Sequence, residues 1–270
     1  MTPIPVIVRG GGDLASGVAL RLHRAGIQFV IAELEKPLAV RRTVSFAQAI
    51  YEGEIEIENV LAKKVNSFQE ARENSNRGII PVLIESDLQT IISEQPIAII
   101  DGRMIKRVPE ISIASADLVI GLGPGFISGR DCHAVVETLR GHNLGRVFWE
   151  GSAASDTGQP GSIVSYDVDR VLRAPAAGFL ESNAEIGQQL KKGDLIATVV
   201  GSEVRAGFDG VLRGLIHPSV EVTQGMKIGD LDPRNDPSFC YRVSDKALAI
   251  GGGALEALLT RPEIRRQLWE

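Results

Sequence analysis

The stretch PVIVRGGGDLASGVALRLHRAG, which begins at Pro5, constrains the fold of this chain more than any other. Its first six residues, PVIVRG, are mostly apolar and are predicted to form a buried strand. In the following segment Leu14, Val18 and Leu22 recur with the spacing of one helix face, and Gly26 is typical of a helix end. A buried strand that leads directly into a helix is the building unit of a parallel sheet covered by helices.

The same alternation continues to about residue 130. QFVIAEL, IIPVLIE, IAIID and ADLVIGL are further strand candidates, and two short helices are predicted between them. Those helices are SFQEAREN and SDLQTIISEQ, with N-caps expected at Ser67 and Ser86. We therefore expect an α/β fold that begins with a Rossmann-like parallel sheet domain over residues 1–165.

The turn after the first strand carries a possible phosphate-binding pattern. Gly10, Gly12 and Gly17 are spaced as G-x-G-x-x-A-x-G, which lets a backbone approach a phosphate at a helix N-terminus. Glu33 ends the next strand, where a carboxylate can hold a ribose hydroxyl. Asp13 would place a negative charge beside such a phosphate, and the turn can equally be a plain connection. Nucleotide binding and a structural turn both remain open.

Charged side chains follow two of the predicted strands. Arg41 and Arg42 come after the second strand, and the segment DGRMIKR supplies Asp101, Arg103 and Lys106 after a later one. Because the carboxyl ends of parallel strands share one edge of a sheet, these groups are expected near the glycine turn, around an anionic ligand. Solvated surface positions are the alternative.

The loop GLGPGFISG follows the strand ADLVIGL, and its Gly123 and Gly125 can present backbone N–H groups to an anion or can simply form a turn. The next segment, DCHAVVETLRGHNLGRVFWE, is compatible with a helix or a hairpin, and its β-prone residues favour the hairpin. The candidate reactive side chains there are Cys132, His133, Glu137, Arg140 and His142.

Cys132 is the most reactive of these residue types. Nearby arginines and histidines would lower its pKa and make it a nucleophile or soft-metal ligand, whereas a buried, inert cysteine is the alternative. A strand would send Cys132 and His133 to opposite faces, which disfavours a Cys–His dyad. No metal site is expected, because Cys240 is distant in the sequence and no paired-ligand spacing occurs.

The C-terminal part contains an internal repeat. RAPAAGFL, from Arg173, aligns with RAGFDGVL, from Arg205, at an offset of 32 residues, and the register continues to Gly193 and Gly225. We expect a small all-β barrel-sandwich hybrid of the biotinyl and lipoyl type over residues 166–235. TVVGSEVRA between the repeats has no lysine, so no covalent biotin or lipoate is expected. Residues 236–270 are predicted to form a C-terminal helical segment, broken at a triple glycine, that packs back on the body.

Charge and composition limit the functional classes. A net charge of -5 disfavours nucleic-acid binding, and no apolar run reaches the ~20 residues that cross a bilayer. The N-terminus lacks the succession of a signal peptide, so a cytoplasmic protein is expected, without nucleic-acid or membrane partners. A homo-oligomer remains open.

Several segments together resemble a known family: RGGGDLASGVALRL, EKPLAVRRTVSF, GLGPGF, DCHAVVETLRGHNLGRV and WEGSA. They are similar to the YqeB-type accessory proteins of selenium-dependent molybdenum hydroxylases. The glycine turn is also similar to the Rossmann portion of XdhC-like proteins, although Asp13 stands where their turn tends to have a histidine and their N-terminal cysteine region is missing.

The resemblance implies a maturation factor that binds molybdopterin or a nucleotide as its phosphate-bearing cofactor. Its partner would be a molybdenum hydroxylase or another cofactor-maturation protein. From the residues alone, an NAD(P)-dependent Rossmann-fold enzyme and a non-catalytic interaction scaffold are the alternatives. Whether the chain catalyses a reaction is open.

Overall fold

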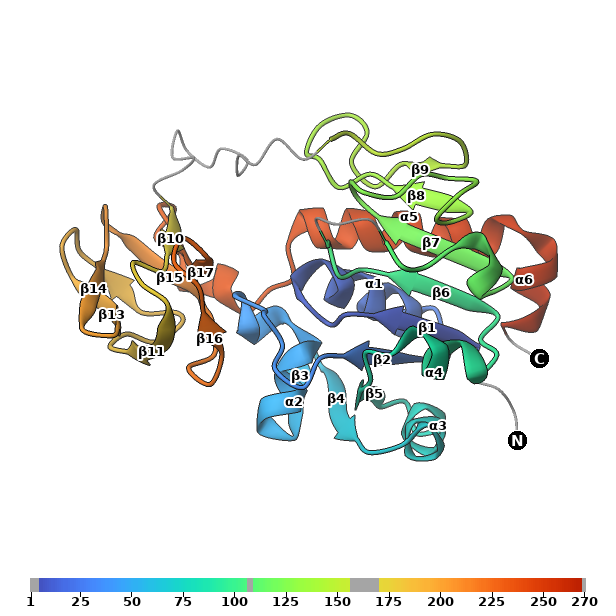
Figure 1. Cartoon of the computed structure of the whole chain (residues 1–270), viewed down its shortest axis with the longest axis horizontal. Helices are drawn as coiled ribbons and strands as arrows, with labels where there is room; N and C mark the ends of the chain where they lie inside the picture. Colours follow the sequence, from blue (N-terminus) through green and yellow to red (C-terminus); the bar gives the residue numbers. More distant parts are fainter. Residues whose placement is uncertain (1–4, 106–108, 156–169, 269–270) are drawn as a thin grey trace.

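The computed structural model describes residues 5–105, 109–155 and 170–268. Two lobes are visible in Figure 1. The large lobe is a nine-stranded sheet with helices on both faces, and it includes the C-terminal helices. The small lobe, residues 170–232, consists of two four-stranded sheets. No helix in the described ranges is long and apolar enough to cross a membrane.

The large sheet has the strand order β3-β4-β5-β2-β1-β6-β7-β8-β9. All neighbouring pairs from β4 to β8 are parallel, whereas β3 and β9 join the two edges antiparallel. Its strands are β1 (Val6–Arg9), β2 (Phe29–Glu33), β3 (Glu54–Ile57), β4 (Val60–Val65), β5 (Ile80–Ile84), β6 (Ala98–Asp101), β7 (Leu118–Leu122), β8 (Ala134–Val136) and β9 (Val147–Phe148).

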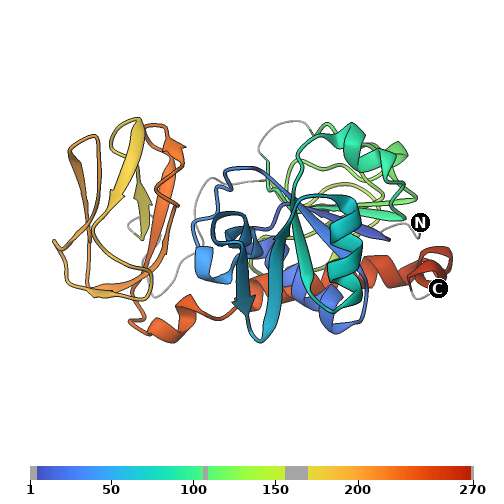
Figure 2. The same cartoon turned by 90° about the horizontal axis from the view of Figure 1, so that it is seen from below.

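Helices cover both faces of this sheet, as Figures 1 and 2 show. Alternate residues of β1 face opposite sides: Val6 and Val8 belong to the core beneath α1 and α5, and Ile7 belongs to the core beneath α3 and α4. The helices are α1 (Asp13–Arg24), α2 (Ala49–Glu52), α3 (Phe68–Asn76), α4 (Leu88–Ser93), α5 (Asp245–Thr260) and α6 (Pro262–Gln267). The 3₁₀ turns are η1 (Arg42–Val44), η2 (Phe46–Gln48), η3 (Ile113–Ser115) and η4 (Pro237–Cys240).

Helices α1 and α5 contact each other backbone to backbone. A Cβ atom placed on Gly17 would lie 2.2 Å from the carbonyl oxygen of Ala247, and one on Gly251 would lie 2.4 Å from the carbonyl oxygen of Gly17. One on Gly253 would lie 2.1 Å from the carbonyl oxygen of Gly145. Helix α5 runs without interruption through the triple glycine, so the predicted break there is wrong: close packing stabilises the helix across it.

The small lobe is built from the predicted repeat. Strands β11, β12 and β13 are followed 32 residues later by β15, β16 and β17, which confirms the offset. The two sheets have the orders β10-β17-β15-β12 and β14-β13-β11-β16, so each takes two strands from each repeat. The strands are β10 (Val171–Arg173), β11 (Gly178–Ser182), β12 (Gln189–Leu190), β13 (Leu195–Val199), β14 (Ser202–Arg205), β15 (Gly210–Leu215), β16 (Glu221–Val222) and β17 (Lys227–Asp232).

The fold class expected from the sequence is wrong. The large sheet is mixed, because the hairpins β3–β4 and β8–β9 add an antiparallel strand at each edge of the expected parallel sheet. The repeats form two separate antiparallel sheets, and nothing in the described residues identifies a barrel-sandwich hybrid of the biotinyl or lipoyl type. Strand spacing and glycine turns predict that strands exist, but they do not determine which strands pair.

Of the predictions for single elements, one helix cap and the hairpin are confirmed, and the other helix cap is wrong. Ser67 is the N-cap of α3, as predicted, but α4 is capped by Asp87 rather than Ser86, because the Asp87 carboxylate accepts from the N–H of Thr90. The segment after Cys132 is the favoured hairpin and not a helix. The predicted boundary at residues 165 and 166 lies outside the described residues.

Candidate functional site

Side chains of the protein occupy the predicted phosphate-binding turn. Gly11 donates its N–H to Glu33 at 2.6 Å, and the other carboxylate oxygen of Glu33 accepts from Leu34 at 2.7 Å. Burial raises the pKa of Glu33, although these hydrogen bonds and the charge of Arg103 oppose the shift. A Cβ atom on Gly10 would lie 3.2 Å from the Cγ atom of Arg103, so that side chain covers the turn.

The charged residues after β6 neutralise one another. Arg9 is 1 % exposed and pairs with Asp101 at 3.3 Å and Glu110 at 2.9 Å. Arg103 pairs with the same two carboxylates at 2.6 and 2.7 Å. Asp101 and Arg103, both predicted ligand contacts, therefore have internal partners. Lys106 lies outside the described residues.

Arg41 fastens the start of α1 to the segment before α5. Its guanidinium pairs with Asp13 at 2.9 Å and donates to the carbonyl oxygens of Phe239 at 3.0 Å and Arg242 at 3.3 Å. The two predicted ligand residues Asp13 and Arg41 thus contact each other, and their contact is an internal connection of the chain.

The remaining predicted glycines have local structural roles. Gly12 is the N-cap position of α1, and Gly17 allows the close approach to α5. Gly123 and Gly125 have φ values of 75° and 101°, which favour glycine. A Cβ atom on Gly123 would lie 2.6 Å from the hydroxyl of Thr138.

The stretch from Cys132 onward is packed into the sheet edge. Cys132 is fully buried, and burial raises the pKa of its thiol to about 12, which opposes thiolate formation. The Nδ1 atom of His133 accepts the N–H of Val119 at 2.9 Å, and burial lowers the pKa of this histidine. Cys132 is therefore a buried thiol, and His133 is a half-buried imidazole whose Nδ1 atom is occupied as an acceptor.

The other three candidates are separate from that pair. Glu137 accepts from the N–H groups of Thr138, Leu139 and Ala154 at 2.7, 2.8 and 2.8 Å, which is a structural arrangement. Arg140 pairs with Asp245 at the start of α5 through two contacts of 2.8 Å. His142 is exposed. The structure does not bring these five candidates into one reactive group, and no metal-binding group of three or more His, Cys, Asp or Glu occurs in the described residues.

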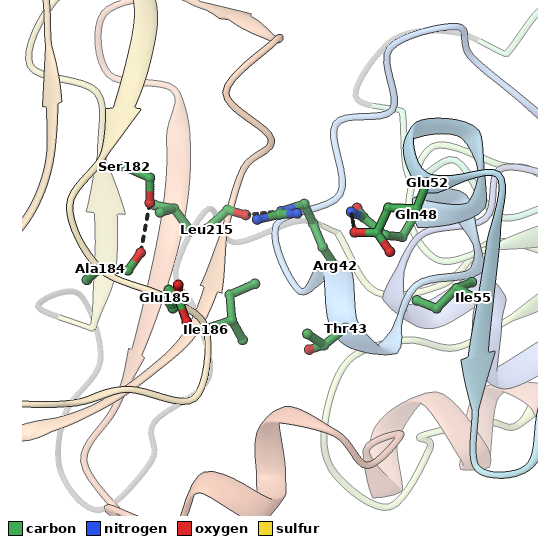
Figure 3. A pocket seen from close by; sticks show the side chains of 10 residues that line it. All are labelled: Arg42, Thr43, Gln48, Glu52, Ile55, Ser182, Ala184, Glu185, Ile186 and Leu215. Carbon is green, nitrogen blue, oxygen red and sulfur yellow. Dashed lines mark hydrogen bonds between the residues drawn. The ribbon is translucent and has the colours of Figure 1, made fainter.

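A cleft of about 260 Å³ lies between the two lobes (Figure 3). One wall comes from η1, η2, α2 and β3 of the large lobe, and the other from the β11–β12 loop and the end of β15 in the small lobe. It is lined by Arg42, Thr43, Gln48, Glu52, Ile55, Ser182, Ala184, Glu185, Ile186 and Leu215. Clefts between lobes are common places for small ligands.

Arg42 reaches across this cleft. Its Nε atom donates to the carbonyl oxygen of Leu215 at 2.8 Å, whereas its two terminal nitrogens have no acceptor among the described residues. The side chain is half-buried. Burial lowers the pKa of Arg42 and Glu52 raises it, and a guanidinium stays charged in either case. The cleft therefore holds a positioned cation with unused donors.

Gln48 lies in the wall beside Arg42. Its side-chain amide nitrogen donates to Glu52 at 2.6 Å, and its carbonyl oxygen is buried without a hydrogen-bond donor among the described residues. Buried polar atoms normally have partners, so this oxygen marks a place where a donor is missing.

The lobes also meet next to the cleft. The rings of Tyr51 and His217 stack with centroids 3.8 Å apart and an interplanar angle of 7°. The N–H of Ser219 donates to the Nδ1 atom of His217, and burial lowers the pKa of that histidine. The hydroxyl of Thr43 donates to the carbonyl oxygen of Cys240, in η4 after the small lobe, at 2.6 Å. The stacked rings thus join the two lobes beside the cleft.

Sequence reasoning named Arg42, but for a phosphate at the glycine turn. It missed Gln48 and Glu52 entirely. Their i, i+4 spacing is an ordinary helical pair, and the opposite wall comes from residues 182–215, far along the chain. No local signal in the sequence connects these two segments.

Comparison with known proteins finds one curated relative with a similar sequence. No family model matches the chain. It is 45% identical over 254 residues to the uncharacterized protein YqeB of Escherichia coli K12, and the alignment covers 94% of this chain and 47% of that protein. The predicted resemblance to YqeB is therefore confirmed, and the chain spans about half the length of the curated relative it matches.

Solved structures give weak likenesses only. They include an aspartoacylase family protein of Mesorhizobium loti (9% identity, TM-score 0.26, covering 86% of this chain and 85% of that one). They also include the ectoine utilization protein EutE (DoeB) of Ruegeria pomeroyi (11%, 0.27, 84% of each). A third is a succinylglutamate desuccinylase/aspartoacylase of Rhodobacter sphaeroides (11%, 0.26, 85% of each). With TM-scores this low, these likenesses carry no argument about the present chain.

The expected function needs correction. The curated relative is named only as an uncharacterized protein, so the expected role in molybdenum hydroxylase maturation has no support from it. The alternative of a dinucleotide-dependent enzyme also fails on the geometry, because Glu33 takes the N–H of Gly11 and Arg103 covers Gly10.

Proposed function

We propose that this chain, YqeB-type in sequence over nearly its whole length, binds a small carboxylate-bearing molecule in the cleft between its lobes. The observation that carries the proposal is the state of Arg42, whose Nε atom is fixed to Leu215 while both terminal nitrogens lack acceptors among the described residues. A guanidinium presents two parallel N–H donors that match the two oxygens of a carboxylate.

The surroundings of Arg42 favour this ligand. Ile55, Ile186 and Leu215 supply apolar surface, which strengthens an ion pair by excluding water. The fixed Nε atom means that little side-chain entropy remains to be lost on binding. Pockets for drug-sized ligands occupy about 300–1,000 Å³. At about 260 Å³, this cleft suits a molecule smaller than a nucleotide.

Arg42→Met tests the proposal, since it removes the guanidinium and keeps the aliphatic stem. Hexanoate is a suitable probe, and its dissociation constant can be measured by calorimetry. Losing a charge-assisted contact of about 1.5–3 kcal/mol should weaken binding roughly 10- to 100-fold. Arg173→Met is the matched control, because Arg173 also donates to a backbone oxygen, that of Gly225, and does not line the cleft.

The control should bind hexanoate as the wild type does, and thermal unfolding of both variants checks that they are folded. If the wild type does not bind hexanoate, or if Arg42→Met binds it equally well, Arg42 is not a carboxylate receptor.

A further inference from the structure

The side-chain carbonyl oxygen of Gln48 is a buried hydrogen-bond acceptor without a donor among the described residues. The residue is 3 % exposed, and this oxygen has no hydrogen-bond partner among the described residues. A buried acceptor without a donor is unfavourable, and it is retained where a ligand or water supplies the donor. Gln48 is also one of the residues that line the cleft, which makes a ligand in the cleft a candidate source of that donor.

The orientation of this amide is fixed by its neighbours. An ionised carboxylate only accepts hydrogen bonds, so the contact of 2.6 Å with Glu52 requires the amide nitrogen of Gln48 to face Glu52. The carbonyl oxygen must then point away from Glu52. The backbone N–H of Gln48 donates to Ser45 at 2.9 Å, which holds the residue in place. The free acceptor is thus a stable feature of the wall.

The charges of the cleft lining favour a cationic donor. Arg42 is the positive side chain of the lining, and Glu52 and Glu185 are the negative ones, on opposite walls. Glu52 keeps one carboxylate oxygen without a partner among the described residues, and the carboxylate of Glu185, which is exposed, has none there either. A ligand carboxylate paired with Arg42 would leave these two negative charges uncompensated, whereas a ligand that also carries a positive charge compensates one of them.

We infer that the ligand carries a protonated amine as well as a carboxylate, with Arg42 holding the carboxylate and Gln48 and Glu52 accepting from the amine. This inference rests on the proposed function and narrows its ligand class to aliphatic amino acids. An ammonium group offers three N–H donors, enough for the Gln48 carbonyl and the free oxygen of Glu52. Ile55, Ile186 and Leu215 provide apolar contact for the aliphatic part.

Three probes of matched skeleton separate the two contacts. L-Norleucine has both charged groups, hexanoate lacks the amine, and pentylamine lacks the carboxylate. Calorimetric titration of the full chain should show norleucine binding about 10-fold more tightly than hexanoate or pentylamine. If norleucine and hexanoate bind equally, the inference is overturned and the proposed function stands. If none of the three binds, both are overturned.

Gln48→Met removes the acceptor and keeps the size of the side chain. The preference for norleucine over hexanoate should fall from about 10-fold to about 2-fold, while the affinity for hexanoate stays unchanged. Gln69→Met is the matched control, because Gln69 makes the same kind of i, i+4 contact, with Glu73, on exposed helix α3. The control should keep the full preference, and loss of the preference there would overturn the inference.

Glu52→Gln provides a second test that does not depend on the stability of Gln48→Met. A glutamine at position 52 still accepts from the amide of Gln48 but removes one negative charge. Norleucine and pentylamine should bind about 5-fold more weakly, and hexanoate should bind no more weakly than before. A merely structural role of Glu52 would weaken all three probes alike, and that result would refute the inference.

Discussion

The triple glycine of α5 allows a test in which adjacent, chemically identical substitutions have opposite effects. A Cβ atom on Gly252 meets nothing within 4 Å, whereas one on Gly253 would lie 2.1 Å from the carbonyl oxygen of Gly145 and 2.9 Å from Val136. Replacing glycine by alanine in a helix gains about 1 kcal/mol when nothing obstructs the methyl group. Gly252→Ala should therefore raise the free energy of unfolding by up to about 1 kcal/mol.

Gly253→Ala gains the same helix propensity, but its methyl group would clash with the carbonyl oxygen of Gly145. Overpacking costs about 1–3 kcal/mol, and the upper end applies because a backbone carbonyl cannot rotate away as a side chain can. After the propensity gain, the net loss is about 2 kcal/mol, so the two variants should differ by about 3 kcal/mol. At about 2–4 °C per kcal/mol, their melting temperatures should be separated by roughly 10 °C.

Differential scanning calorimetry and urea unfolding of both variants measure this difference. The close packing of α5 against the segment around Gly145 would be refuted if the two variants shifted stability in the same direction by similar amounts. Gly251→Ala provides a further check. Its Cβ atom would lie 2.4 Å from the carbonyl oxygen of Gly17, so it should resemble Gly253→Ala.

Two further predictions concern ionisable groups. Cys132 and Cys240 are both buried, and burial raises the pKa of each thiol, so native protein should not react with a thiol reagent while urea-unfolded protein shows two reactive thiols; rapid native labelling would contradict this. For Glu110, burial acts to raise the pKa, but hydrogen bonds from Arg103, the backbone and Arg9 lower it to about 2. Because the folded pKa lies below the usual ~4.3, the contribution of Glu110 to stability is present above about pH 4.5 and is lost as the pH falls toward 2. The difference in unfolding free energy between wild type and Glu110→Gln should therefore shrink over that range, and a constant difference between pH 6 and pH 2.5 would contradict it.

The sequence predicts the local elements of this fold because their signals are local. The helical spacing of Leu14, Val18 and Leu22 and the serine before α3 depend on neighbours within a few residues. The repeat offset is likewise visible as a pattern. Which strands share a sheet depends on contacts between segments far apart, and so the interleaving of the repeats and the antiparallel β3–β4 edge of the large sheet were not predictable in this way.

For a related reason, the structure gives several predicted site residues internal partners that their sequence neighbours do not indicate. Arg41 and Arg42 follow a strand, as a ligand-binding pair would, but their hydrogen-bond acceptors include Phe239 and Leu215. Cys132 has charged neighbours in the sequence, yet the sheet buries it completely. Residue type and spacing indicate which reactions or contacts a side chain could make. Burial and partners from distant segments decide whether that side chain is free to make them.

The packing of α5 on α1 has a consequence for how the chain is made. Helix α1 is synthesised early, but the helix that covers it spans Asp245–Thr260. While the small lobe is being translated, the apolar face of α1 and the adjoining face of the sheet have no cover from α5. A nascent chain in that state exposes aggregation-prone surface. The large lobe can therefore complete its core only after residue 260 has been synthesised, and until then this apolar surface stays exposed on the nascent chain.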